Sequence, residues 1–107
     1  MIRRRYRAGE DAQTPRQARR VRRQSEKAIA ANAQRWSELD PVDYQAFADL
    51  ARETAVAYGD LALVAGLLGR EPERYRVAEQ RYLWLADEYT SHARARHVAR
   101  ADEMEVR

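Results

Sequence analysis

The chain has 107 residues, of which 20 are basic and 17 acidic, and 45% of its residues are hydrophobic. This length is that of one domain, and the absence of cysteine excludes disulfides and thiolate chemistry and fits a cytoplasmic protein. No segment approaches the roughly 20 consecutive apolar residues of a membrane span, and no apolar segment follows the basic N-terminus as it would in a secretory signal.

Residues 1–13 lack a periodic apolar face, so we expect a flexible basic arm ahead of a single helical domain over residues 14–107. The charge is concentrated at this end of the chain. Residues 1–27 carry ten basic side chains against three acidic ones, a net charge of +7, whereas residues 28–107 carry ten against fourteen, a net charge of −4. This asymmetry indicates a polyanionic partner, most simply a nucleic acid.

The first helix is predicted from about residue 15 to residue 38. Thr14 is a favourable N-cap, Pro15 suits the first helical position, and Gln17 can bond back to the cap amide. Apolar and small side chains then recur at steps of three and four residues from Ala18 to Trp36, and we expect Trp36 to lie in the core. The basic residues of this segment spread over most of the remaining circumference.

The second helix is predicted to begin after Asp40, which would cap it. Gly59 and Asp60 either break this helix, with Asp60 capping a short third segment, or lie within it. The apolar residues 61–68 are expected to be central to the core, and Gly69 is typical of a helix C-terminus.

The last helix is predicted to start at Glu71-Pro72-Glu73 and to continue to about Met104, with an apolar face that runs from Tyr75 to Ala93. About 30 helical residues span about 45 Å, which exceeds the size of a compact domain of this length. This helix is therefore expected to project from the domain or to pack on a second copy. The expected fold class is all-α: an antiparallel bundle of three helices, or four if Gly59-Asp60 is a break, with long first and last helices.

The arginines of the N-terminal region are the strongest functional signal. Guanidinium groups form paired hydrogen bonds with phosphates, and each contact releases condensed counterions. The alternatives are a solubilising surface and contact with an anionic membrane, although the first helix lacks the large apolar face that insertion requires. We interpret nine of these arginines as nucleic-acid-binding, with DNA favoured: Arg3, Arg4, Arg5, Arg7, Arg16, Arg19, Arg20, Arg22 and Arg23.

Residues 64–75 resemble the turn of helix-turn-helix regulators, with an Ala, a Leu-Gly pair and a later apolar residue at the usual spacing. Two features depart from that pattern. Arg70 stands where an apolar residue is usual, and Glu71 and Glu73 would face phosphates of their own charge. The resemblance makes Arg76 a candidate base contact, but we favour an ordinary packing corner with no DNA role.

A candidate protein interface lies on the last helix. Trp84 lies off the apolar stripe of that helix and shares a second face with Val77, next to Leu85. In a bundle this face is expected to pack against another helix of the same chain, whereas on a projecting helix it would serve self-association. We name Val77, Trp84 and Leu85 as interface residues and expect a homo-oligomer.

No motif supports an enzyme, a cofactor or a metal site. His92 and His97 point to different faces of the last helix, and Glu88 with His92 supplies only two of the ligands that a metal needs. The leading hypothesis is a non-enzymatic DNA-associated accessory or regulatory protein. The alternative is a protein–protein adaptor or oligomeric assembly subunit whose helical body binds a protein partner.

Overall fold

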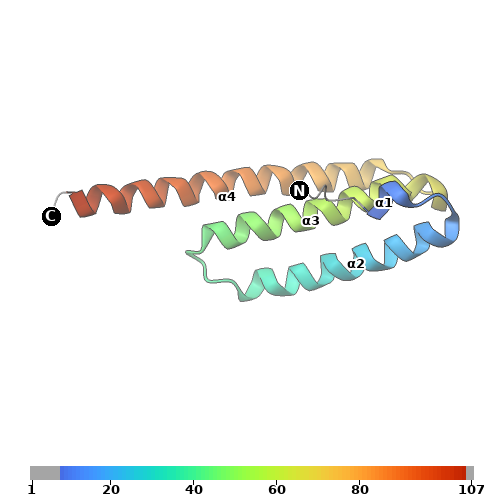
Figure 1. Ribbon diagram of the computed structural model, residues 1–107, viewed down its shortest axis with the longest axis horizontal. Helices are drawn as coiled ribbons and strands as arrows, with labels where there is room; N and C mark the ends of the chain where they lie inside the picture. Colours follow the sequence, from blue (N-terminus) through green and yellow to red (C-terminus); the bar gives the residue numbers. More distant parts are fainter. Residues whose placement is uncertain (1–7, 106–107) are drawn as a thin grey trace, which may run out of the picture.

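The computed structural model describes residues 8–105, and within them the secondary structure is helical only (Figure 1). The elements are a short α1 (Ala8–Asp11), three long helices α2 (Pro15–Glu38), α3 (Tyr44–Ala65) and α4 (Glu73–Glu105), and a short 3₁₀ helix, η1 (Gly66–Leu68), after α3. The three long helices lie antiparallel, with α3 between α2 and α4 (Figure 1). The predicted all-α class is confirmed.

The start of α2 agrees with its prediction. The Gln17 amide donates a hydrogen bond to the Thr14 hydroxyl (3.2 Å), and the Thr14 amide donates one to the Gln17 side chain (3.1 Å). Pro15 occupies the first helical position. Because this capping box involves only neighbouring residues, it can be recognised from the sequence alone.

The start of α3 corrects the prediction that Asp40 caps this helix. Asp43 is the N-cap, and its carboxylate accepts a hydrogen bond from the Ala46 amide (3.1 Å). Asp40 forms the connecting turn, in which its carboxylate accepts from the Val42 amide (3.1 Å) and its carbonyl from the Asp43 amide (2.9 Å). The helix therefore begins at the later aspartate, because the turn uses the earlier one.

Helix α3 continues through Gly59 and Asp60, which are both buried, so the second of the two predicted alternatives holds. The helical region ends after η1 at Gly69, as predicted. Gly69 adopts the left-handed conformation (φ 66°), and the Arg70 amide donates to the Ala65 carbonyl (2.9 Å). Glycine fits this position because it has no Cβ to oppose a positive φ.

The short helix α1 changes the expected boundary of the N-terminal arm. Residues 8–11 are helical and packed on α3: Gly9 is buried, and its amide donates a hydrogen bond to the Asp60 carboxylate (3.2 Å). The flexible arm expected over residues 1–13 is therefore not found at α1, and residues 1–7 lie outside the described residues. The docked residues lack an apolar period because the contact depends on close approach of a glycine rather than on a large side chain.

The core centres on α3, which supplies most of the buried side chains. Aromatic rings connect it to both neighbours. The Trp36 ring of α2 lies edge-on to Phe47 with centroids 4.8 Å apart, and Phe47 stacks on Tyr89 of α4 at 5.0 Å. Tyr58 stacks on Tyr82 at 5.6 Å. Trp36 thus packs inward as predicted, and it is half-buried.

Helices α2 and α4 flank α3 without close backbone contact. Throughout these two described helices, no Cα atom of one lies within 8 Å of a Cα atom of the other. They meet through side chains such as Trp36 and Tyr89, whose ring centroids are 5.7 Å apart. The space between them forms a groove of about 340 Å³ above Thr54, with Ile29 on one wall and Leu85 on the other. The bundle is therefore an open layer of three helices.

Helix α4 projects beyond the rest of the molecule, as its predicted length requires (Figure 1). The described residues have a radius of gyration of 17.3 Å and a longest dimension of 62 Å, whereas a compact 100-residue domain has a radius of gyration of about 13 Å. Arg96 tethers α4 to the body, because its guanidinium donates a hydrogen bond to the Val42 carbonyl (2.6 Å). The following residues extend past the end of α3.

Candidate nucleic-acid interface

The exposed edge of the layer is formed by α2. Because α3 covers only one side of α2, Ala18, Val21, Ser25 and Asn32 are buried against it. The Asn32 side-chain amide donates to the Thr54 hydroxyl (3.2 Å) and helps to fix the rotation of α2 on α3. The opposite side of α2 is left to solvent.

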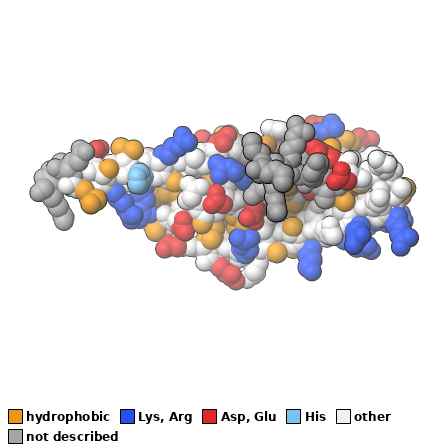
Figure 2. Space-filling model, in the orientation of Figure 1, with side chains coloured by type: hydrophobic (Ala, Val, Ile, Leu, Met, Phe, Trp, Pro, Cys, Tyr) orange, Lys and Arg blue, Asp and Glu red, His pale blue; other side chains and the backbone are white. Residues whose placement is uncertain are grey.

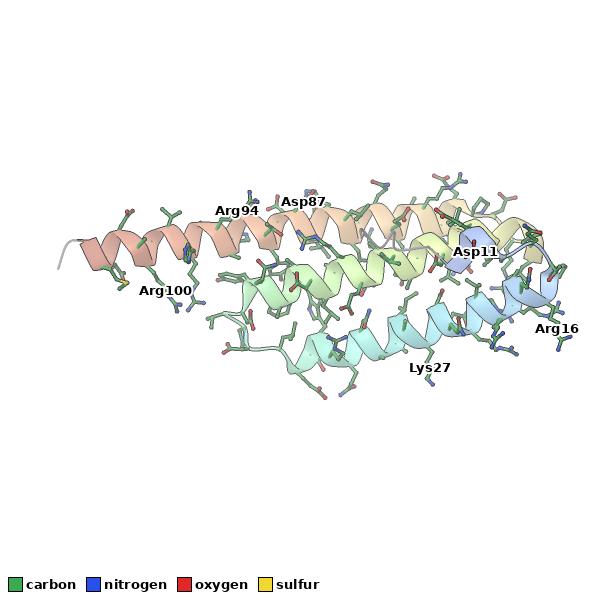
Figure 3. The ribbon with its side chains drawn as sticks, in the orientation of Figure 1. Asp11, Arg16, Lys27, Asp87, Arg94 and Arg100 are labelled. Atoms are coloured by element: carbon green, nitrogen blue, oxygen red, sulfur yellow. The ribbon has the colours of Figure 1, made fainter. Side chains whose placement is uncertain are left out.

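Five cations occupy that opposite side, and we call them the α2 stripe: Arg16, Arg19, Arg20, Arg23 and Lys27. At about 100° per residue, four of them lie within about 40° of one line along the helix, and Arg19 lies about 60° from it. All five are exposed. Figure 2 shows basic side chains along the free edge of α2, and Figure 3 shows Arg16 and Lys27 pointing away from α3.

The α2 stripe has no ion-pair partner among the described residues. Other arginines of the chain differ in this respect. Arg35 bonds Glu53 of α3 (3.1 Å), and Arg52 contacts both Asp49 (3.4 Å) and the Thr90 hydroxyl (2.6 Å). Those arginines connect helices, whereas the stripe keeps its donors available for an external anion.

Acidic residues stand largely apart from the α2 stripe. Between Arg16 and Lys27 the sequence holds one acid, Glu26, which lies about 80° around the helix from the centre of the stripe. The net negative charge of residues 28–107 belongs mainly to α3, α4 and the turn before α3. A polyanion at the outer edge of α2 would therefore be separated from most of that charge by α2 itself.

The remaining predicted contacts do not gather with the stripe. Arg22 is half-buried and lies about 120° from its centre, toward the groove between α2 and α4. Arg76 is exposed on α4, on the other edge of the layer. The four N-terminal arginines, Arg3, Arg4, Arg5 and Arg7, lie outside the described residues. Lys27 was missing from the predicted contacts, although its spacing from Arg23 and Arg20 places it on their face.

The geometry of α3 and α4 does not reproduce a helix-turn-helix. A DNA-binding pair crosses at roughly 90–120°, so that its second helix can enter the major groove. Here α4 folds back alongside α3 (Figure 1), with Tyr82 stacked on Tyr58 and Tyr89 stacked on Phe47. The favoured interpretation of residues 64–75 as a packing corner agrees with this arrangement.

The predicted protein-interface residues fall into two environments. Leu85 is half-buried and lines the groove between α2 and α4. Trp84 and Val77 are 61% and 52% exposed. The expectation that another helix of the chain covers this face is therefore wrong for the described part of the chain, because α3 packs on the other side of α4.

Histidines and carboxylates form no further site in the described region. Within residues 8–105, no group of three or more His, Asp or Glu side chains could hold a metal ion. The His92 ring packs against Tyr44 with centroids 5.7 Å apart. None of the described helices combines the length and apolar character that crossing a bilayer requires.

Comparisons with protein-family models, with curated proteins and with solved structures returned no significant match to this chain.

Proposed function

We propose that the protein binds nucleic acid, with duplex DNA favoured, and that the α2 stripe makes sequence-independent contacts with the phosphate backbone. The observation that carries the proposal is the set of five exposed cations without described ion-pair partners on one face of one helix. This role is non-enzymatic and suits an accessory or regulatory protein that acts in the cytoplasm.

The dimensions of the stripe suit a phosphate backbone. From Arg16 to Lys27 the helix rises by about 16 Å, at about 1.5 Å per residue. Phosphates of one DNA strand advance about 3.4 Å each along the duplex axis, so the stripe spans roughly five of them. The rigid helix keeps the cations apart at steps of one turn, which lowers the entropy lost when they bind.

The strength of binding follows from counterion release. With five phosphate contacts, the slope of log K against log salt concentration is expected to be about −4 to −5, because each contact contributes about −0.9. Contacts of this kind carry no base preference, so binding at physiological salt should have a Kd of about 10⁻⁶ to 10⁻⁴ M.

The test compares two double variants that lose the same charge. Arg20→Gln with Arg23→Gln neutralises the stripe, and Arg74→Gln with Arg100→Gln neutralises exposed arginines of α4. By fluorescence anisotropy with a labelled duplex at 0.1 M salt, the first pair is expected to weaken binding about 50-fold and to reduce the salt slope by about 2. Equal losses for the two pairs would overturn the proposal, since binding would then depend on net charge alone.

A second candidate function is that of an assembly subunit, in which the helical body associates with another protein chain. The observation that favours it is the exposure of Trp84 and Val77 on the side of α4 that faces away from α3. Large exposed apolar residues on one helix face are typical of interaction surfaces.

A further inference from the structure

The outer face of α4 carries one residue in every seven: Val77, Trp84, Ser91 and Val98. These positions drift by only about 20° per heptad along a straight helix, so they form one continuous line. Trp84 lies about 160° around the helix from Tyr82, which stacks on Tyr58 of α3. Trp84 is 61% exposed, Val98 is 57% exposed, and Ser91 is also exposed.

The outer face continues beyond the body of the protein. Past Arg96, α4 has no described helix beside it, and residues 97–104 are all exposed. A helical segment as short as residues 97–104 is marginal in water without a packing partner. From Val77 to Asp102 the face extends for about 38 Å, which is sufficient for a helix–helix contact of more than three heptads.

Each flank of this line carries a basic and an acidic side chain, one on either side of Ser91. On one flank, Arg81 and Asp102 lie three heptads apart; on the other, Asp87 and Arg94 lie one heptad apart. All four side chains are exposed, and none has an ion-pair partner among the described residues. Figure 3 shows Asp87 and Arg94 on the same side of α4, with Arg100 pointing to the opposite side.

We infer that the outer face of α4 binds the same face of a second copy of this chain, antiparallel and centred on Ser91. In an antiparallel pair with this centre, residues whose numbers sum to about 182 lie opposite each other. Trp84 then packs on Val98 of the second copy. Arg81 faces Asp102 and Asp87 faces Arg94 of the second copy, each within one residue of the same level, and symmetry repeats every pair.

Charge selects this arrangement over the alternatives. In a parallel pair the opposite flanks of the two copies meet, so Asp87 would face Glu88 of the second copy and Arg81 would face the uncharged Gln80. Like charges at such positions oppose association. An antiparallel pair centred on Trp84 would leave Val98 and Asp102 without a partner helix, because α4 begins at Glu73. At the proposed centre, the small Ser91 side chains let the helices approach, and their hydroxyls can bond each other.

The inference uses a different helix from the α2 stripe, so it does not depend on nucleic-acid binding. It rests on the second candidate function and gives it a partner, a second copy. The paired face leaves the outer edge of α2 uncovered, because α2 and α4 lie on opposite edges of the layer (Figure 1).

The first test is sedimentation velocity of the full chain over a concentration series. We expect a reversible dimer with twice the 12.5 kDa chain mass. Arg81→Glu should raise the dissociation constant about tenfold or more, because it turns two attractive pairs into repulsive ones. Arg81→Glu combined with Asp102→Arg should restore the dimer. Arg100→Glu, the matched control outside the face, should leave it unchanged.

Cysteine cross-linking tests the orientation, since the chain has no cysteine of its own. Ser91→Cys should form a disulfide-linked dimer under mild oxidation. Val98→Cys should not, because in the proposed antiparallel dimer the two residues at position 98 lie far apart. Cross-linking of both variants would mean a parallel pair and overturn the register. A chain that stays monomeric at every concentration would overturn self-association itself, whereas a dimer unaffected by Arg81→Glu would retain an assembly role but place it on another surface.

Discussion

The contact between α1 and α3 makes Gly9→Ala an informative perturbation. A Cβ atom at residue 9 would lie 2.9 Å from the Asp60 carbonyl oxygen and 3.0 Å from Leu63 Cβ. Both atoms are fixed by helix α3 and neither is the end of a flexible side chain. The substitution must therefore push α1 away from α3 and lengthen the bond between the Gly9 amide and the Asp60 carboxylate.

The expected magnitude combines two opposing effects. Overpacking at a close contact costs about 1–3 kcal/mol, and a helical Ala in place of Gly recovers about 0.5–1 kcal/mol. We expect a net loss of about 1–2 kcal/mol in the free energy of unfolding. For a domain of about 100 residues this loss lowers the Tm by very roughly 4–16 °C.

Urea and thermal unfolding monitored by circular dichroism measure this effect. The matched control is Gly66→Ala, because a Cβ there meets nothing within 4 Å and the backbone is right-handed (φ −59°). The control should be more stable than the natural chain by about 0.4–1 kcal/mol. If Gly9→Ala were as stable as Gly66→Ala, the docking of α1 on α3 would be refuted.

Three further predictions concern stability and are checked by the same unfolding measurements. Val64→Ala should cost about 2 kcal/mol, because Val64 is 0% exposed in the core and its lost methyl groups leave a cavity. Thr14→Ala should cost about 1 kcal/mol through loss of the α2 cap, and Thr14→Ser should preserve most of it. Burial, reinforced by the neighbouring Tyr82, raises the pKa of Tyr58 above its ordinary value. Stability should therefore fall as the pH rises above about 10, where the unfolded chain ionises this group first, and Tyr58→Phe should reduce that fall.

Local signals predicted most of the helix boundaries. The capping box at Thr14 and the turn glycine Gly69 act through neighbouring residues, so their patterns are visible in the sequence. The same signals wrongly favoured Asp40 as the cap of α3, because aspartate is a good cap at either position and only the path of the turn assigns the roles of Asp40 and Asp43. Gly59-Asp60 was ambiguous because local signals do not show that Asp60 accepts a hydrogen bond from an amide 51 residues away.

The arrangement of the helices was less accessible than their boundaries. Periodicity identifies the buried face of α2 and that of α4, but it does not say that both pack on α3 without close backbone contact with each other. The exposure of Trp84 follows from that open layer, in which no other helix of residues 8–105 covers the outer face of α4. The packing of α1 on α3 could not be predicted from apolar periodicity, because it depends on glycine at residue 9 having no side chain.

The candidate interface was partly visible in the sequence. The concentration of arginines before residue 28 was evident from charge alone. The sequence did not show which of these arginines point outward and that Arg22 is half-buried, because this depends on how α2 is rotated on α3. The bond between Asn32 and Thr54 helps to fix that rotation. Ala18 and Val21, on the buried face of α2, belong to the core, so point variants of the stripe test binding without the loss of core side chains that deleting the whole segment would cause.

Chemical-shift mapping tests the central claim most directly. With ¹⁵N-labelled full chain and a short unlabelled duplex at low salt, the largest amide shifts are expected within residues 16–27 of α2, and they should disappear as salt is added. Shifts confined to α3 and α4, or no shifts at concentrations well above 10⁻⁴ M, would contradict the assignment of the α2 stripe as a phosphate-binding surface.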